Sequence, residues 1–341
     1  MTLPLQKNYR PMEAKPASEL PTGSDWQYEP KWDGFRCLGF RDGKRVDLMS
    51  KSGKPLARYF PELVAALASL KAPQFVLDGE IVIPVDGSLS FDHLLMRIHP
   101  AAGRIEKLSH ESPCVFIVFD LLVDDKGKSL VKELLEQRRP RLEKFAAKYL
   151  HANQTIRLSP LTLDLAVARE WFHMGVALDG VIAKRRDMPY QSGERTGMQK
   201  IKRHRTADCV VGGFRYLEKK PVAGSLLLGL YNEQGQLDHV GFTSSFQAKD
   251  RPALTKKLKK IIEPPGFTGK APGGLSRWST KRSMEWQPLK PELVAEVQFD
   301  HFTGGRFRHG TKFLRWRPEK SPRQCTLRQV EQESRSALNL L

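Results

Sequence analysis

The sequence predicts an α+β protein built of two parts, a larger mixed body followed by a small β-barrel. Strand-like and helix-like stretches alternate up to about residue 204. From residue 205 onward, short strands of even length surround a single basic helix. The later part is also the more basic per residue. A chain of 341 residues has room for two domains of ordinary size.

Strands in the first part are indicated by alternation of apolar and polar residues or by unbroken apolar runs. The expected strands are residues 35–43, 74–87, 114–123 and 178–185, the second of them divided into two short strands by Asp78-Gly79. The run 114–123 is apolar throughout, which predicts a strand covered on both faces.

Helices in the first part are indicated by apolar residues at helical spacing. The expected helices are residues 61–70, 132–150 and 163–175. Pro140 falls inside the second, so we expect it to begin a new helix or to kink the existing one. Gly175 is the residue expected to close the third.

The second part has the strand spacing of a small barrel. The expected strands are residues 210–216, 225–232, 237–246 and 293–302. Between them, residues 253–266 predict a basic helix that is stopped by Pro264-Pro265. This order is typical of an oligonucleotide-binding (OB) fold. The residues after Pro322 show no strong pattern.

Composition limits the partner and the compartment. The net charge of +18 favours a polyanionic partner, most simply nucleic acid, although a membrane surface or a merely basic enzyme has the same signal. No apolar run approaches the roughly 20 residues of a membrane span, and the first residues lack the apolar stretch of a secretory signal. The four cysteines form no Cys-x-x-Cys pair, which favours a reducing cytoplasm over a zinc or disulfide framework.

Lys31 is the candidate nucleophile. It precedes a turn expected at Asp33-Gly34, and a lysine attacks only as the free amine. By itself the short motif Lys-x-Asp-Gly also fits a surface lysine beside a turn. Lys200 and Lys202 alternate along a strand, so both point to one face and together offer a phosphate site.

Taken in chain order, these motifs resemble the nucleotidyltransferase superfamily of ATP-dependent DNA ligases, RNA ligases and mRNA capping enzymes. The matching segments are residues 31–36 (K-x-D-G-x-R), 50–53, 78–80 (D-G-E), 119–121, 179–184, 200 with 202 (K-x-K), and 308–320. The resemblance runs from about residue 10 to 325 and is closest to the small bacterial C-type ligases. Two positions depart from the family pattern: Lys51 stands for the usual Arg, and Asp179 stands for the usual Glu.

The resemblance implies an adenylation domain of mainly antiparallel sheets over residues 1–204, an OB-fold domain over 205–325 and a tail over 326–341. It also implies three reactions. Lys31 attacks the α-phosphorus of ATP, the AMP moves to a 5′-phosphate at a nick, and the 3′-hydroxyl then displaces AMP. ATP is expected rather than NAD, because the four-cysteine zinc module of the NAD-dependent enzymes has no counterpart in the sequence.

The resemblance also implies a role for each site residue, and these roles are consistent with the residue types. The implied contacts are Glu29 with the adenine amino group, Phe119 stacked on adenine, Glu80 with the ribose or a metal, Asp179 with Mg²⁺ or Mn²⁺, Arg36 and Lys51 with the ribose or the 5′-phosphate, Lys200 and Lys202 with the α-phosphate, and Arg317 and Lys320 with the departing pyrophosphate.

The expected partner is nicked duplex DNA, bound by a monomer in the bacterial cytoplasm at the nucleoid during repair, with polymerase or end-processing activity supplied by separate proteins. The candidate DNA contacts are Arg36, Lys51, Lys270, Arg277, Lys281 and Arg282. We expect the second domain to swing about residues 203–208 between ATP-bound and DNA-bound arrangements. The alternatives are an RNA ligase or capping guanylyltransferase, and a noncatalytic nucleic-acid binding protein.

Overall fold

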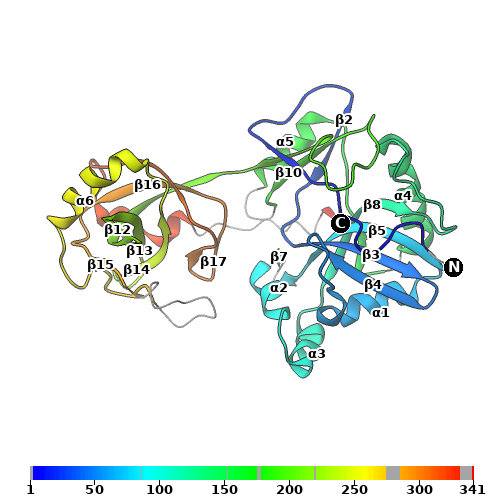
Figure 1. Cartoon of the computed structure of the whole chain (residues 1–341), viewed down its shortest axis with the longest axis horizontal. Coiled ribbons are helices and arrows are strands. Elements are labelled where there is room, and N and C mark those ends of the chain that lie inside the picture. The colour runs from blue at the N-terminus through cyan, green and yellow to red at the C-terminus, as the bar shows by residue number, and fades with distance from the viewer. Residues whose placement is uncertain are drawn as a thin grey trace. The chain divides into compact units, whose positions relative to one another are not determined.

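The computed structural model describes residues 3–85, 87–151, 153–174, 178–218, 220–273, 285–330 and 340–341. The chain divides into two compact units (Figure 1). The first unit comprises residues 1–203 and 334–341, and the second comprises residues 204–333. Among the described residues, no helix combines the length and apolar character that crossing a membrane requires.

The first unit contains a five-stranded sheet in the order β4-β3-β5-β8-β9, antiparallel except for the parallel pair β8 and β9. Its strands are β3 (Phe35–Asp42), β4 (Arg45–Ser50), β5 (Gln74–Val82), β8 (Val115–Val123) and β9 (Ile156–Leu158). Leu77, Ile81 and Phe116 point into an apolar core that helix α1 also enters through Leu63 and Leu67. The neighbouring strands β3, β5 and β8 of this sheet carry Arg36, residues 78–80 and residues 119–121, which all belong to expected motifs.

The expected division of residues 74–87 at Asp78-Gly79 is wrong, because β5 runs unbroken through both residues. Gly79 lies against the neighbouring strand β8, where an added Cβ would lie 2.6 Å from the carbonyl oxygen of Ile117 and from the Phe116 ring. Asp78 is fully buried and paired with Arg36. The dipeptide therefore serves close strand packing and a buried ion pair instead of a turn.

A second, four-stranded sheet in the first unit has the order β1-β11-β10-β2. Its strands are β1 (Lys15–Ala17), β2 (Trp26–Pro30), β10 (Gly180–Arg185) and β11 (Met198–Lys202). Tyr28, Trp32 and Val181 belong to the core on this side, and Ile117 from the other sheet joins them. The described residues Leu340 and Leu341 also pack against this cluster.

The helices of the first unit are α1 (Pro61–Ser69), α2 (Phe91–Arg97), α3 (Ala102–Glu111), α4 (Leu135–Tyr149) and α5 (Leu165–His173), and a short hairpin joins β6 (Pro84–Val85) to β7 (Ser88–Leu89). The expected new helix at Pro140 is wrong, because α4 starts at Leu135 and continues through this residue. Pro140 is exposed, whereas Arg138, Arg139 and Leu142 are buried and anchor the helix around it. Gly175 lies outside the described residues.

The second unit is an OB fold, as expected. Its main strands are β12 (Arg205–Leu217), β13 (Lys220–Tyr231), β14 (Leu237–Thr243), β16 (Val294–Phe299) and β19 (Lys312–Trp316), in the order β14-β13-β12-β16-β19. An isolated parallel bridge links Thr243 at the end of β14 to Thr311, the residue before β19, and so brings the two edges of this order together. Helix α6 (Arg251–Lys259) packs against β13 and lies in sequence between the third and fourth strands. Short strands β15 (Gln287–Pro288), β17 (Phe302–Thr303) and β18 (Arg306–Phe307) complete the unit.

Three boundaries in the second unit differ from expectation. Helix α6 ends at Lys259, several residues before Pro264-Pro265. Strand β12 begins at Arg205 and pairs with β16, so residues 205–208 belong to the barrel instead of a polar hinge, and only residues 203–204 separate it from β11. Val330, expected in a tail, is buried in the barrel core. Backbone pairing and burial thus extend the barrel in both directions along the chain.

Candidate functional site

The first unit contains a pocket between its two sheets. Strands β2, β10 and β11 contribute from one sheet and β3, β5 and β8 from the other, while residues 11–14 close one side. Seven of the residues expected from the sequence line it: Glu29, Lys31, Arg36, Lys51, Glu80, Phe119 and Lys200. The fold therefore brings together residues that are up to 171 positions apart in the chain.

Lys31 is fixed by the backbone of the fourth motif. Its N–H donates to the carbonyl of Gly180 (2.9 Å), and its own carbonyl accepts from the N–H of Asp179 (3.0 Å). A side chain at position 180 would collide with the carbonyl oxygen of Ile201, so this close approach requires glycine. The Asp179 carboxylate forms ion pairs with Lys31 and, at 3.1 Å, with the Nζ of Lys202.

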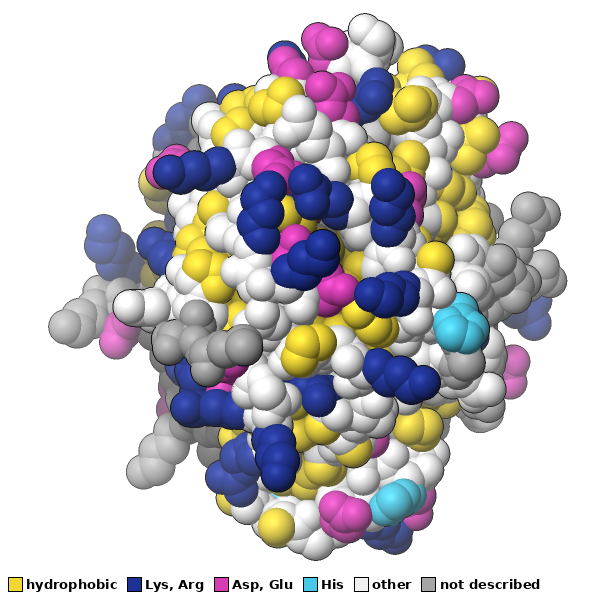
Figure 2. All heavy atoms as spheres, turned by 90° about the vertical axis from the view of Figure 1, so that its right-hand side faces the viewer, with side chains coloured by type: hydrophobic (Ala, Val, Ile, Leu, Met, Phe, Trp, Pro, Cys, Tyr) yellow, Lys and Arg dark blue, Asp and Glu magenta, His cyan; other side chains and the backbone are white. Residues whose placement is uncertain are grey.

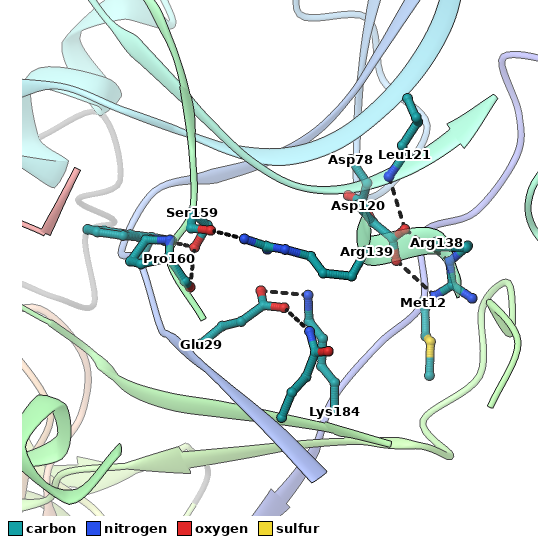
Figure 3. A network of polar contacts seen from close by, with 12 residues as sticks. Met12, Glu29, Asp78, Asp120, Leu121, Arg138, Arg139, Ser159, Pro160 and Lys184 are labelled. Atoms are coloured by element: carbon teal, nitrogen blue, oxygen red, sulfur yellow. Dashed lines mark hydrogen bonds and ion pairs between the residues drawn. The ribbon is translucent and has the colours of Figure 1, made fainter. Parts of the chain in front are cut away.

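Glu29 occupies a buried end of the pocket (Figure 3). Its carboxylate accepts from the Nζ of Lys184 (2.7 Å) and from the amide of Gln27 (2.9 Å). Glu29 is 2% exposed and Lys184 is 7% exposed. We call Gln27, Glu29, Phe119 and Lys184 the Glu29 end of the pocket. It presents a carboxylate acceptor and an ammonium donor side by side.

No role was predicted for Lys184 from the sequence, although this residue ends the fourth motif, residues 179–184. The antiparallel register of β10 and β2 places Lys184 opposite Gln27 and Ile182 opposite Glu29. This pairing could have been anticipated only by knowing that these two strands are neighbours, because nearly the whole first unit separates them in the chain.

Phe119 lines the pocket and is also largely buried. The Nζ of Lys184 lies 4.5 Å from its ring centroid, and the Cζ of Arg36 lies 4.4 Å from it. Cations at these distances are attracted to the ring by its quadrupole. The ring and the two cations therefore position one another.

Arg36 is held by a buried network. Its guanidinium donates to both oxygens of Asp78 (2.6 and 2.7 Å), and Asp78 also accepts from the hydroxyl of Tyr190 (2.6 Å). The backbone N–H of Met12 donates to the same hydroxyl (2.9 Å). Bidentate pairs of this kind fix orientation as well as charge. Tyr190 was not expected from the sequence, since it belongs to no motif.

A second buried pair lies nearby, where Arg138 of α4 donates to both oxygens of Asp120 (3.0 and 2.9 Å; Figure 3). Asp120 directly follows Phe119 on β8. Arg139 donates to the carbonyl of Ser159 (2.7 Å), whose hydroxyl accepts from the indole N–H of Trp32 (2.9 Å). These contacts tie α4 to β8 and, through Ser159, to Trp32, the residue that follows Lys31.

Two titratable groups in the pocket are shifted. Burial raises the pKa of Glu80 to about 7, although the charges of Arg36 and Lys31 act to lower it. The pKa of Lys200 is lowered, first by partial burial and then by the charges of Lys202 and Lys31. Several cations crowded on one side of a pocket favour an anionic ligand such as a phosphate.

Carboxylate oxygens suited to a divalent cation also gather near Lys31. One oxygen of Asp33 lies within 4.8 Å of one of Asp179. From the sequence, Asp33 was expected only in a turn, whereas the fold brings its carboxylate near that of Asp179, the expected metal ligand. Oxygen donors of this kind suit Mg²⁺ or Mn²⁺.

The other expected residues lie elsewhere. Arg317 and Lys320 belong to the second unit, where both bind Asp208 at 2.8 and 2.6 Å. Lys270 is exposed in the second unit, and Arg277, Lys281 and Arg282 lie outside the described residues. We call Asp208, Arg317 and Lys320 the Asp208 cluster.

Basic side chains also gather outside the pocket. Figure 2 shows the side of the first unit on which α4 lies, with Lys and Arg side chains over much of it and acidic side chains between them. Around α4, Glu133 pairs with Lys128 (2.7 Å) and Arg141 (2.9 Å), and Asp125 pairs with Lys148 (3.2 Å). Much of this surface charge is therefore balanced locally.

Comparison with known proteins gives consistent matches. A family model described as the ATP dependent DNA ligase domain matches residues 11–202, and one described as the ATP dependent DNA ligase C terminal region matches residues 219–320. DNA ligase C2 of Mycolicibacterium smegmatis is 42% identical and covers 99% of this chain and 98% of its own length. DNA ligase C of Mycobacterium tuberculosis is 40% identical and covers 97% and 96%.

One solved structure, from a structure-function study of Lig E DNA ligases, aligns with a TM-score of 0.56. It is 17% identical, and the alignment covers 90% of this chain and 99% of that one. At this identity the match supports the arrangement of strands and helices alone.

Proposed function

The chain belongs to the ATP-dependent DNA ligase family, close to the small bacterial C-type ligases, and from this premise we propose how its residues join DNA. The Nζ of Lys31 attacks the α-phosphorus of ATP, and pyrophosphate leaves as the N–P bond forms. The 5′-phosphate of a nick then attacks the same phosphorus, which frees Lys31 and yields an adenylated DNA end. Finally the 3′-hydroxyl attacks the 5′-phosphorus, AMP leaves, and the strand is sealed.

The observation that carries this proposal is the meeting of Lys31, Asp179 and Lys202, with Lys200 in the same pocket. Phosphoryl transfer depends on positioning and on neutralising charge on the phosphate oxygens. Lys200 and Lys202 lie on one strand beside Lys31 and supply that positive charge. Lys31 must lose a proton and leave its ion pair with Asp179 before it attacks.

The Glu29 end of the pocket suits adenine. The Watson–Crick edge of adenine offers an amino donor beside a ring-nitrogen acceptor, and Glu29 with Lys184 offers the complementary acceptor and donor. Guanine presents the reverse order at these two positions, so it would leave both charged groups wrongly paired. We therefore propose that this pair, with Phe119 packed on the base, selects ATP over GTP.

We propose that Asp179, with Asp33, holds a divalent cation such as Mg²⁺ or Mn²⁺, and that Glu80 offers an oxygen to the same cation or to the ribose. The cation, when bound, supplies positive charge to the phosphate oxygens. Arg36 and Lys51 would meet the ribose or the 5′-phosphate. Arg317 and Lys320 would orient pyrophosphate, so we also propose that the second unit moves between the adenylation and DNA-bound steps.

Nicked duplex DNA is the proposed substrate, in DNA repair in the bacterial cytoplasm, with any polymerase or end-processing step left to separate proteins. The OB fold is a common platform for nucleic acids. The net charge of +18 is consistent with binding to the phosphate backbone. Lys270 is a candidate contact within the described residues.

The test is incubation with α-labelled ATP and Mg²⁺ or Mn²⁺, followed by addition of a nicked duplex. The wild-type chain should acquire a covalent label and pass it to the 5′-phosphate end. Lys31→Ala should acquire none, whereas Lys71→Ala, an exposed lysine outside the pocket, should behave like the wild type. Covalent label on Lys31→Ala would reject the nucleophile, and label that never moves to DNA would reject strand joining.

A further inference from the structure

The carboxylate of Glu13, at the rim of the pocket, binds two cationic side chains. The sequence did not predict that these two cations act together. The Oε2 atom of Glu13 lies 3.1 Å from the Nζ of Lys51 and 3.2 Å from the Nε of Arg195. Glu13 and Lys51 both line the pocket. Lys51 belongs to the second motif, whereas Glu13 and Arg195 stand outside every motif of the sequence.

The backbone fixes Glu13 firmly. Its N–H donates to the carbonyl of Glu194 (2.8 Å), and the neighbouring Met12 N–H donates to the buried hydroxyl of Tyr190 (2.9 Å). The hydroxyl of Ser192 donates to the carbonyl of Arg10 (2.7 Å). Segment 10–14 is therefore hydrogen-bonded to segment 190–195 along its length. These bonds hold the backbone of Glu13 in place and so limit where its side chain can reach.

The two cations are far more exposed than the carboxylate between them. The side chains of Lys51 and Arg195 are 56% and 66% exposed, whereas that of Glu13 is 15% exposed. Long exposed side chains sample many rotamers, and two like charges repel each other. Contact with one shared oxygen limits both effects and keeps the two nitrogens within reach of a single phosphate group.

The contact with Glu13 leaves most donors of both cations free to bind a ligand. A lysine ammonium has three N–H groups and an arginine guanidinium has five. The pair also acts on the rest of the pocket, since the charges of Lys51 and Arg195 join burial, Lys202 and Lys31 in lowering the pKa of Lys200. The pair therefore contributes to the same positive field that surrounds Lys31.

We infer that Glu13 is a positioning residue for AMP transfer: it holds Lys51 and Arg195 as a pair that binds the terminal phosphate monoester of the DNA end. The inference rests on the proposed function, in which a 5′-phosphate must approach the lysyl-AMP. Exposed ion pairs contribute little to folding, so loss of Glu13 should affect the geometry of this step more than the stability of the chain.

The test separates the steps of the reaction in single turnovers. Pre-adenylated Glu13→Gln should transfer AMP to a nicked 5′-phosphate about 10-fold more slowly than the wild type, because misplaced reacting groups lose rate steeply. Formation of the lysyl-AMP from ATP should stay within about twofold of the wild type. Glu194→Gln is the matched control, since it neutralises an exposed acid next to Arg195 whose side chain lies outside the pocket.

A mutant cycle gives the decisive readout. Lys51→Ala combined with Arg195→Ala should slow AMP transfer, and adding Glu13→Gln to this pair should slow it no further, because Glu13 acts through the two cations. The inference would be overturned if the losses in transfer rate were additive, or if Glu13→Gln transferred AMP at the wild-type rate. Equal slowing of adenylation and transfer would also overturn it. Failure of the wild-type protein to transfer AMP at all would instead reject the proposed function.

Discussion

The Glu29 end of the pocket and the Asp208 cluster both pair a carboxylate with cations, but they differ in exposure. The side chains of Glu29 and Lys184 are 2% and 9% exposed. In the Asp208 cluster, Arg317 and Lys320 are 21% and 23% exposed. A buried pair is costly to break because the remaining charge has no water, whereas an exposed cation can change partners at low cost. The buried pair therefore suits recognition of a fixed base, and the more accessible cations of the Asp208 cluster suit a phosphate that arrives and leaves.

The largest expected effect comes from breaking the buried pair. Lys184→Met leaves Glu29 charged and without its ion-pair partner, which should lower the free energy of unfolding by about 3–5 kcal/mol and slow lysyl-AMP formation by about 100-fold. Urea unfolding and labelling with ATP measure the two effects. Lys184→Met combined with Glu29→Gln should recover much of the stability, and the same loss in both variants would contradict the argument.

The pH dependence of adenylation should reveal Glu80. Its pKa of about 7 means that the carboxylate form, which accepts hydrogen bonds or binds a cation, increases as pH rises from 6 to 8. The rate of lysyl-AMP formation should rise over this range by about 10-fold, and Glu80→Gln should have a lower and flatter profile. Rapid-quench labelling at fixed ionic strength measures both. If the wild type and Glu80→Gln had the same pH profile, the pH dependence would come from titratable groups other than Glu80.

The Asp208 cluster should show an effect on rate without an effect on folding. Asp208→Asn should slow reaction with ATP by about 10-fold, because Arg317 and Lys320 lose their shared partner, while sealing of a pre-adenylated nick should change little. Its free energy of unfolding should fall by less than that of Lys184→Met, because Arg317 and Lys320 are partly exposed to water. A stability loss as large as that of Lys184→Met would remove the distinction between the two regions.

The smallest effect is expected at single exposed cations on the barrel. Lys270→Ala should weaken binding to nicked DNA by about twofold to threefold and reduce the slope of log K against log salt by about 1. Titration of labelled duplex at several salt concentrations measures both. If the slope of log K against log salt did not change in Lys270→Ala, Lys270 would not contact the DNA phosphate backbone.

Much of the fold followed from local patterns. The buried strand β8, helix α1 and four strands of the barrel, with a helix between the third and fourth, were readable because apolar spacing depends on immediate neighbours. The division at Asp78-Gly79 and the new helix at Pro140 were wrong, and the barrel begins within the segment 203–208 that was expected as a hinge. In each case, packing or pairing with a distant segment outweighed a local signal, as Ile117 does at Gly79 and Phe299 does at Arg205.

By itself the sequence determined the family and predicted the nucleophile and most of the residues that line the pocket, because spacing of the motifs constrains which side chains share a strand face. Only the tertiary structure decided the partners of those side chains. Lys184 against Glu29, Tyr190 against Asp78 and Glu13 between Lys51 and Arg195 are contacts between segments far apart in the chain. Such contacts depend on the order of the strands in the sheets and on burial, because a buried charge is stable only beside an opposite charge. Neither the strand order nor the burial of a residue can be read from a short stretch of sequence.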